Sequence, residues 1–469
     1  MEVGTFPYKW KFLCQNDIDD RAKRTRIAIL DLHSGKAPTR IDLQTSDSLT
    51  RLLSDPGFNH NPVHSRIFVV EDLSRDVIEA LGSQYDIDPL FFRRHILDFL
   101  WYNTRDPWTE LPNLAHITQE KNYFNIRYMV PKYFQSQESV EAAVEQLGGY
   151  NVLRRLEQEL SWKVRKLRNI KGSSVGVLRS KTSLWIRKNK PDESGTLAIL
   201  VVDPTLPEGH PLWGGPRYLE PCPSMHAPVP SPLPSNSHFE AVIHCSLAIP
   251  ASELALVPDT PHILGTPMLA LVAAEWITIV TYITTTLTKI EYELENAQYR
   301  DSSTGLTGAL DRLHPLRRLM PVYRNMISET MTGILNPAHP LNATIGIEVS
   351  PVTKLHGDFN SILDAMDSLQ VRTQNIISLA TTIISIEENQ RAMQMNVNLV
   401  RVTYLAVIFV PMAFVSSFFS MTPDLKSIEQ TVWIYFAVAI PLTILCVAAA
   451  DPNRARSVWM TLWSWIRAR

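Results

Sequence analysis

Two long uncharged runs near the C-terminus constrain the fold of this chain more than any other feature. Residues 402–423 and residues 431–450 contain no Asp, Glu, Lys or Arg. A helix rises about 1.5 Å per residue, so each run can cross a hydrocarbon core about 30 Å thick. Membrane helices tolerate the internal Pro411 and Pro441 where neighbours satisfy the freed carbonyl groups. The runs predict transmembrane helices at 402–422 and 431–450, joined by an outer loop at 423–430; a pair of buried core helices is the alternative.

The positive charges beside these runs predict their orientation. The connector carries a single basic residue, Lys426, whereas six arginines flank the two runs on their other side: Arg391, Arg401, Arg454, Arg456, Arg467 and Arg469. Lys and Arg concentrate on the cytoplasmic side of membrane helices. The first residues lack the apolar core of a signal peptide. We therefore expect an integral protein of the plasma membrane or an organelle membrane, with two spans, both termini in the cytosol and a basic cytosolic tail at 451–469.

A third apolar stretch, residues 264–287, is interpreted differently. Glu275 lies near its middle, and a charge at that depth in lipid is costly. We expect this stretch to be a packed helix of the soluble part rather than a third span.

The rest of the chain predicts a soluble α/β part followed by helices. Short β-rich runs alternate with helical patterns in residues 1–203, ten prolines fall within a loop at 204–237, and helical patterns fill residues 238–345. A stalk helix at 346–401 continues into the first span, because residues 352–419 contain no proline except Pro411 and no glycine except Gly357. The expected fold is an α+β cytosolic domain, a long stalk helix and a C-terminal two-helix transmembrane hairpin.

Composition and motifs exclude several classes of function. With 45 basic and 47 acidic residues the chain does not favour nucleic acid, and its four cysteines form no CxxC pair. Residues 172–176 match the G-x-S-x-G pattern of hydrolases, but the segment before them is basic and helix-like, so we interpret them as a flexible loop. Residues 163–190 hold ten basic residues and no acid, which favours a solvated face over contact with lipid head groups. No catalytic constellation emerges, so we expect no enzyme.

One face of the first span has the spacing of a pore lining. Its residues recur every three or four positions, which suits helices that supercoil left-handed around an axis. No member carries a charge, and simple packing of one helix on its neighbour would need the same spacing. The stripe consists of Asn396, Leu399, Val402, Ala406, Val410, Ala413 and Ser417, and it ends at Ser420.

These segments resemble the CorA-like divalent cation transporter family. The likeness is carried by Asn396, Leu399 and residues 408–422 in the first span, by residues 66–96, which look like the fungal branch, and by residues 276–295 and 310–323. The resemblance implies a homo-oligomer, a pentamer, embedded in a lipid bilayer. It also implies a divalent cation such as Mg²⁺ as the transported ion rather than a cofactor, with no nucleic acid partner.

The chain departs from this family at the outer end of the first span. Where the family has Gly-Met-Asn, this chain has Ser420, Met421 and Thr422, followed by an acidic outer loop with Asp424 and Glu429. A cage of hydroxyl and carbonyl oxygens is less demanding than a ring of asparagines, which implies relaxed ion selectivity. The alternative is a non-conducting scaffold or a regulatory subunit of a related transporter. No resident metal ligand is assigned.

Overall fold

The computed structural model describes two units of the chain. The described residues are 15–33, 36–59, 63–97, 121–159, 173–187, 195–215, 219, 232–234, 236–296, 305–333, 351–420 and 428–450. The first unit extends to Ile377 and the second begins at Ser378. Helix α12 (Pro351–Phe419) contributes residues to both units, and it confirms the prediction of one long helix over residues 352–419.

A mixed eight-stranded sheet forms the centre of the first unit. Its strand order is β2-β1-β3-β7-β6-β4-β8, with β5 paired to β6. Strands β3 and β7 are parallel and the other pairs are antiparallel. The strands are β1 (Arg26–Leu32), β2 (Thr39–Leu43), β3 (Ser65–Glu71), β4 (Tyr123–Phe134), β5 (Leu156–Glu159), β6 (Ser174–Ile186), β7 (Thr196–Val202) and β8 (His210–Pro211).

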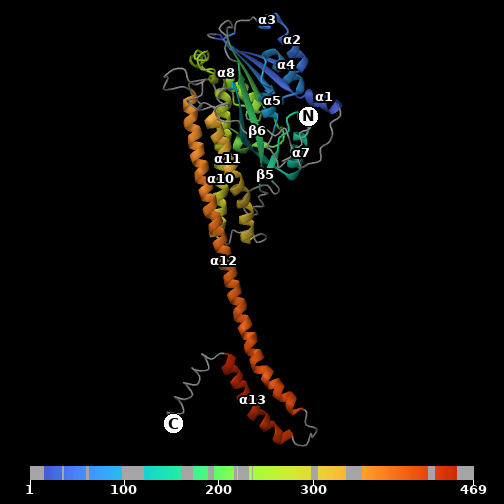
Figure 1. The fold of residues 1–469 in the computed structure, drawn as a ribbon, viewed down its shortest axis with the longest axis vertical. Coiled ribbons are helices and arrows are strands. Elements are labelled where there is room, and N and C mark those ends of the chain that lie inside the picture. The colour runs from blue at the N-terminus through green and yellow to red at the C-terminus, as the bar shows by residue number, and fades with distance from the viewer. Residues whose placement is uncertain are drawn as a thin grey trace. The chain divides into compact units, whose positions relative to one another are not determined.

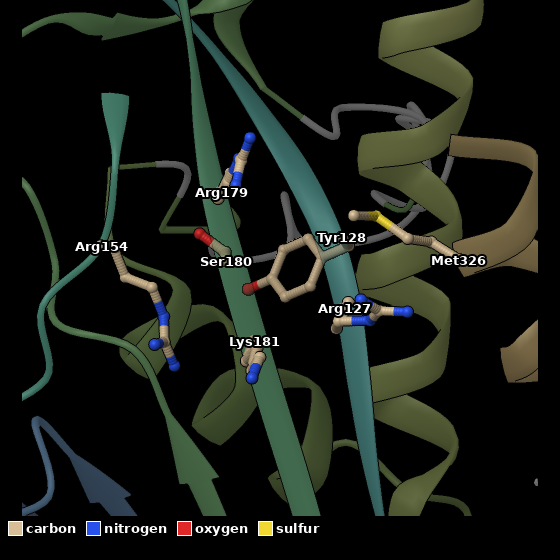
Figure 2. A pocket seen from close by; sticks show the side chains of 7 residues that line it. All are labelled: Arg127, Tyr128, Arg154, Arg179, Ser180, Lys181 and Met326. Carbon is tan, nitrogen blue, oxygen red and sulfur yellow. The ribbon is translucent and has the colours of Figure 1, made fainter. Parts of the chain in front are cut away.

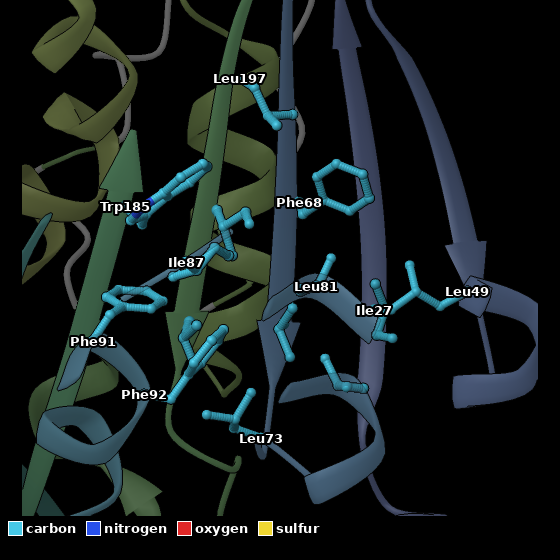
Figure 3. Close-up of a cluster of buried hydrophobic side chains, with 14 of the residues drawn as sticks. Ile27, Leu49, Phe68, Leu73, Leu81, Ile87, Phe91, Phe92, Trp185 and Leu197 are labelled. Carbon is cyan, nitrogen blue, oxygen red and sulfur yellow. The ribbon is translucent and has the colours of Figure 1, made fainter. Parts of the chain in front are cut away.

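Helices cover both faces of this sheet (Figure 1). One face carries α2 (Ser46–Leu53), α4 (Arg75–Tyr85) and α5 (Pro89–Ile96), whose apolar side chains meet those of the strands in the core drawn in Figure 3. Strand β7 is buried along its whole length, as expected of an apolar run between two helical layers. Further helices of this unit are α1 (Gln15–Ala22), α3 (Pro56–Asn59), α7 (Gln137–Leu147) and α9 (Ala251–Leu254).

The opposite face of the sheet carries α8 (His238–Leu247), η3 (Pro261–Gly265), α10 (Thr266–Glu295) and α11 (Gly305–Gly333). Trp276 of α10 and Tyr323 of α11 are fully buried and pack with their ring centroids 5.7 Å apart. The apolar part of α10 is long enough to cross a membrane, yet 72% of it is buried inside the protein. This burial supports the interpretation of residues 264–287 as a packed helix.

The first part of α12 completes a bundle with α10 and α11. Arg372 of α12 pairs with Glu291 of α10 (Nε–Oε1, 3.0 Å), and Arg324 of α11 pairs with Asp367 of α12 (Nε–Oδ1, 2.5 Å). Between these ion pairs lies the apolar face of α12, formed by Phe359, Ile362, Met366, Leu369 and Ile376. This face packs α12 against the rest of the bundle.

Two interpretations of residues in the first unit were wrong. The pattern at 172–176 is not a loop throughout, because β6 begins at Ser174 and contains Gly176. The basic stretch is not a solvated face throughout either, because β6 is buried and Lys181 is only 9% exposed. Pairing with β4 over twelve residues places this basic segment inside the sheet, where the Lys181 ammonium donates to the carbonyl of Arg94 and Arg179 pairs with Glu157.

The proline-rich segment was also only partly predicted. It is not irregular throughout: β8 pairs with the end of β4, and the 3₁₀ helix η1 (Leu212–Gly214) follows. Pro211 lies in β8 at the edge of the sheet, where a missing backbone N–H costs no ladder hydrogen bond. The sheet consequently extends beyond residue 203.

A buried carboxylate, Asp72, joins two loops of this unit. It adopts a left-handed conformation (φ 56°), and its side chain accepts hydrogen bonds from the backbone N–H groups of Asn151 (3.1 Å) and Val152 (2.9 Å). Burial raises the pKa of Asp72 to about 6 in spite of these bonds. An acid whose pKa is raised by folding binds a proton more tightly in the folded state.

We expect this carboxylate to make the protein less stable as the pH rises from about 4 to about 6. A shift of about two pKa units corresponds to about 3 kcal/mol of stability that is present below pH 4 and lost above pH 6. The Asp72→Asn variant cannot titrate there, so the difference in free energy of unfolding between the two proteins should change by that amount over this range. Denaturant unfolding at several pH values tests this, and a constant difference would contradict it.

Candidate functional site

In its described residues the second unit contains two helices in contact. The C-terminal part of α12 packs against α13 (Ile428–Ala450), and the contact buries Pro411 and Val415 of α12 and Ala439 of α13. The hydroxyl of Tyr435 in α13 donates a hydrogen bond to the backbone carbonyl of Met412 (3.3 Å). By length and composition α12 can span a membrane, with only 11% of its apolar window buried, and α13 contributes a shorter apolar stretch at Trp433–Cys446.

The predicted pore stripe lies on the other side of α12. Ala413 and Ser417 each follow a residue buried against α13, Pro411 and Val415, by two positions. Two residues rotate an α-helix by about 200°, so the stripe faces away from α13. All its described members are exposed in the single chain, Asn396, Leu399, Val402, Ala406, Val410, Ala413, Ser417 and Ser420. The structure thus brings them together on one free helix face.

The residues expected to form the selectivity mouth of the pore, Ser420, Met421 and Thr422, are described only at the first of them. The backbone N–H of Ser420 donates a hydrogen bond to the carbonyl of Ser416 (3.0 Å), which closes the last turn of α12. Met421, Thr422 and Asp424 lie outside the described residues, as does the side chain of Glu429.

A second group of polar residues is buried beside the sheet, and sequence reasoning missed it. Arg154 pairs with Asp203 through two hydrogen bonds (Nε–Oδ2, 2.6 Å; Nη2–Oδ1, 2.8 Å). The backbone N–H of Lys181 donates to the same carboxylate (2.7 Å), and His95 lies beside it (Nε2–Oδ1, 3.3 Å). Burial and the positive charges of Arg154 and Lys181 lower the pKa of His95 well below its ordinary value, so the ring is neutral. The signal available in the sequence was an acid directly after an apolar strand, at Asp203.

Figure 2 shows a small pocket next to this group. Its volume is about 10 Å³, enough for about one water molecule. Its remaining basic side chains have partners: Arg127 pairs with Glu329 (2.5 Å), Arg179 with Glu157, and the Lys181 ammonium donates to the carbonyl of Arg94 (2.9 Å). Each of these basic side chains therefore has a hydrogen-bond or ion-pair partner within the chain.

Metal-ligating side chains do not gather anywhere in the described parts of the chain. No three His, Cys, Asp or Glu residues there are placed so that they could hold a metal ion. Arg93 and Arg94 lie in the last turn of α5, after the Asp-Pro start of that helix. Their guanidinium groups are not metal ligands, so this helix offers no cation site there. The candidate site therefore remains the free face of α12.

Comparisons with known proteins point in the same direction. The family model described as CorA-like Mg²⁺ transporter protein matches residues 258–450. The complete CorA magnesium transporter of Methanocaldococcus jannaschii is 11% identical over 90% of this chain and 96% of its own, with a TM-score of 0.37. The soluble domain of the same transporter is 10% identical over 76% of this chain and 96% of its own, with a TM-score of 0.31. No curated protein matches the chain.

The assignment rests on the family model. Its match begins before α10 and ends with α13, so it includes the bundle helices, the free face of α12 and the packed pair α12–α13. It describes a transporter, which agrees with the expectation that the chain is no enzyme and that Mg²⁺ is cargo rather than a cofactor. Residues 258–450 of this chain are a domain of the CorA-like Mg²⁺ transporter family.

Proposed function

We propose that this protein is a homo-oligomeric membrane channel that passes divalent cations down their electrochemical gradient. The observation that carries the proposal is the free face of α12: within a CorA-like domain, a stripe of small, hydroxyl and apolar residues faces away from the only other described helix of its unit. A ring of such helices would enclose a path without charged side chains, with apolar constrictions that gate by dewetting.

The part of α12 that precedes the predicted span at 402–422 supports assembly into an oligomer. Four exposed apolar residues recur every seven positions, Leu379, Ile386, Met393 and Val400. A seven-residue apolar repeat is the pattern by which helices supercoil around one another. We therefore propose a symmetric ring with α12 as its central helix. The ring is a pentamer, as the resemblance to the CorA-like family implies.

Aspartate at two positions of this repeat should weaken assembly. In the double variant Ile386→Asp/Met393→Asp, each chain would place two charges in the packed seam, where an unpaired charge costs several kcal/mol. We expect native mass spectrometry in mild detergent to shift from oligomer to monomer. Gln394→Asp, at an exposed polar position that belongs to neither the seven-residue repeat nor the pore stripe, should leave the oligomer unchanged. A wild type that is monomeric under these conditions would contradict the proposed ring.

We also propose that both termini lie in the cytosol, because basic residues flank the two spans on that side and only Lys426 lies in the connector. The replacement of Gly-Met-Asn by Ser420, Met421 and Thr422 favours relaxed selectivity among divalent cations. The same replacement favours the second candidate, a non-conducting scaffold or regulatory subunit, because such a protein needs no selective mouth.

Ion flux into liposomes that contain the purified protein separates these functions. We expect uptake of Mg²⁺, Zn²⁺, Co²⁺ and Ni²⁺ at similar rates, each driven by its own gradient. Empty liposomes control for leakage. The Val410→Asp variant, which places a charge in the proposed apolar constriction, should change the flux if the ions pass along the stripe. Protein that assembles into a ring but carries none of the four ions would favour the scaffold.

A further inference from the structure

A cavity of about 60 Å³ lies within the first unit, between the sheet and the helices α8 and α10. It is distinct from the free face of α12. Polar side chains from both layers line it, among them Tyr128, Lys132, Asp203, Ser237, His238 and Glu275. A single water molecule needs about 10–15 Å³ of such volume, so the cavity has room for a polyatomic ligand of about four heavy atoms.

The one ammonium group of this cavity is deeply buried. Lys132 of β4 is only 6% exposed, and its ammonium donates to the backbone carbonyls of Leu206 and Glu208, the latter at 3.1 Å. A lysine ammonium has three N–H donors, so one remains for a ligand. Burial lowers the pKa of Lys132 to about 8, which leaves it charged at neutral pH.

The first turn of α8 supplies further donors. Ser237 caps this helix of ten residues by accepting a hydrogen bond from the backbone N–H of Glu240 (3.3 Å), while the N–H groups of the first two residues have no partner within the helix. The Nε2 atom of His238 is covered and has no hydrogen-bond partner among the described residues. Burial lowers the pKa of His238 to about 4, so its ring is neutral and offers one N–H. Helix N-termini attract negative charge.

The two acids at the cavity do not oppose an anion at neutral pH. The carboxylate of Asp203 is already occupied by Arg154 and by the backbone N–H of Lys181. Burial raises the pKa of Glu275 to about 8 although Lys132 opposes this shift, so Glu275 is protonated at neutral pH and its O–H is a donor for a ligand. The ammonium of Lys132 makes its two printed hydrogen bonds to backbone carbonyls rather than to a carboxylate, although Glu208 and Glu275 lie near enough to favour its charged form.

We propose that this cavity binds a small oxyanion, a carboxylate or a phosphate, which Lys132, the ring of His238 and the first turn of α8 hold against the sheet. Protonated Glu275 provides one more donor. Binding is therefore linked to protons, because above pH 8 ionised Glu275 repels the anion and Lys132 loses its charge. An occupied cavity would add a polar link between α10 and β4, two elements that already pack against each other.

Calorimetric titration of the full chain in detergent tests this site. Acetate and inorganic phosphate are the probes, in Bis-Tris propane at constant chloride, which distinguishes a carboxylate site from a phosphate site. At pH 6.5 we expect saturable binding of at least one of them, weakened more than tenfold in Lys132→Met. Lys121→Met, at a partly exposed lysine outside the cavity, should bind like the wild type.

The pH dependence is measured with acetate, which does not itself titrate between pH 6.5 and pH 9. The wild type should lose more than tenfold in affinity over this range, and Glu275→Gln, which stays neutral, should lose less. Ala241→Met fills the cavity without changing a charge, so it should abolish binding even if Lys132→Met does not fold. Absence of saturable binding by folded wild type, or equal binding by wild type and Ala241→Met, would overturn the proposal.

Discussion

Replacing Arg154 by methionine is expected to destabilise the first unit by roughly 3–5 kcal/mol. The guanidinium makes two hydrogen bonds with the Asp203 carboxylate, which is only 6% exposed. It also donates to the backbone carbonyls of His95 (2.6 Å) and Ile96 (3.1 Å) and so ties the end of α5 to the sheet. The methionine would leave a buried carboxylate without its counter-charge and two carbonyls without a donor.

Denaturant unfolding of the wild type and three variants measures this cost. Arg75→Met removes an exposed ion pair with Asp76 (3.5 Å) and should cost less than about 1 kcal/mol. The double variant Arg154→Met/Asp203→Leu removes both charges, so it should be more stable than Arg154→Met alone. A loss below about 1 kcal/mol in Arg154→Met would contradict the role assigned to this ion pair.

The parts of the fold that the sequence predicted correctly depend on local patterns. Strands β1, β3 and β7 are apolar runs, and α5 begins at an Asp-Pro pair in which the side chain of Asp88 accepts a hydrogen bond from Leu90 N–H (2.9 Å). The bundle helices and α12 follow from the helical period and from the lack of prolines. Each of these signals lies within a few residues of the element that it forms.

The parts that were missed depend on contacts between distant residues. Strand β6 carries Arg179 and Lys181 within a longer basic stretch of the sequence, which resembles a solvated segment until its partners are known. Asp203 lies 49 positions from Arg154, and the Lys181 ammonium bonds a carbonyl 87 positions away. The cavity beside α10 has the same origin, since Glu275 and Lys132 come from segments that only the tertiary fold brings together. Periodicity within one segment cannot reveal such pairs.

The candidate pore was more accessible to sequence reasoning, because a stripe with a step of three or four residues must fall on one helix face. The sequence did not show which face α13 would cover. The burial of Pro411 and Val415 supplies that information and leaves the stripe free. The identity of the ion depends on the mouth, where Ser420 is the only member whose position is described.

Restoring the family's residues at this mouth should change ion preference. In the variant Ser420→Gly/Thr422→Asn, the chain regains the Gly-Met-Asn sequence that the family resemblance connects with magnesium. Side-chain amide oxygens reach further than threonine hydroxyls, and Mg²⁺, which dehydrates reluctantly, is held through its water shell by a ring of such oxygens. We expect the ratio of Mg²⁺ flux to Zn²⁺, Co²⁺ or Ni²⁺ flux in liposomes to rise about tenfold or more, equivalent to about 1.4 kcal/mol between competing ions.

The acidic connector supplies a matched control for this experiment. Asp424→Asn removes one negative charge per chain without altering the three mouth residues, so it should lower the flux of all four cations alike. That effect should fade as salt shortens the screening length toward about 8 Å, whereas the ion preference of Ser420→Gly/Thr422→Asn should persist at every ionic strength. If the wild type passes no divalent cation while the restored mouth does, the wild-type protein is the scaffold or regulatory subunit, and the loss of function lies in Ser420 and Thr422.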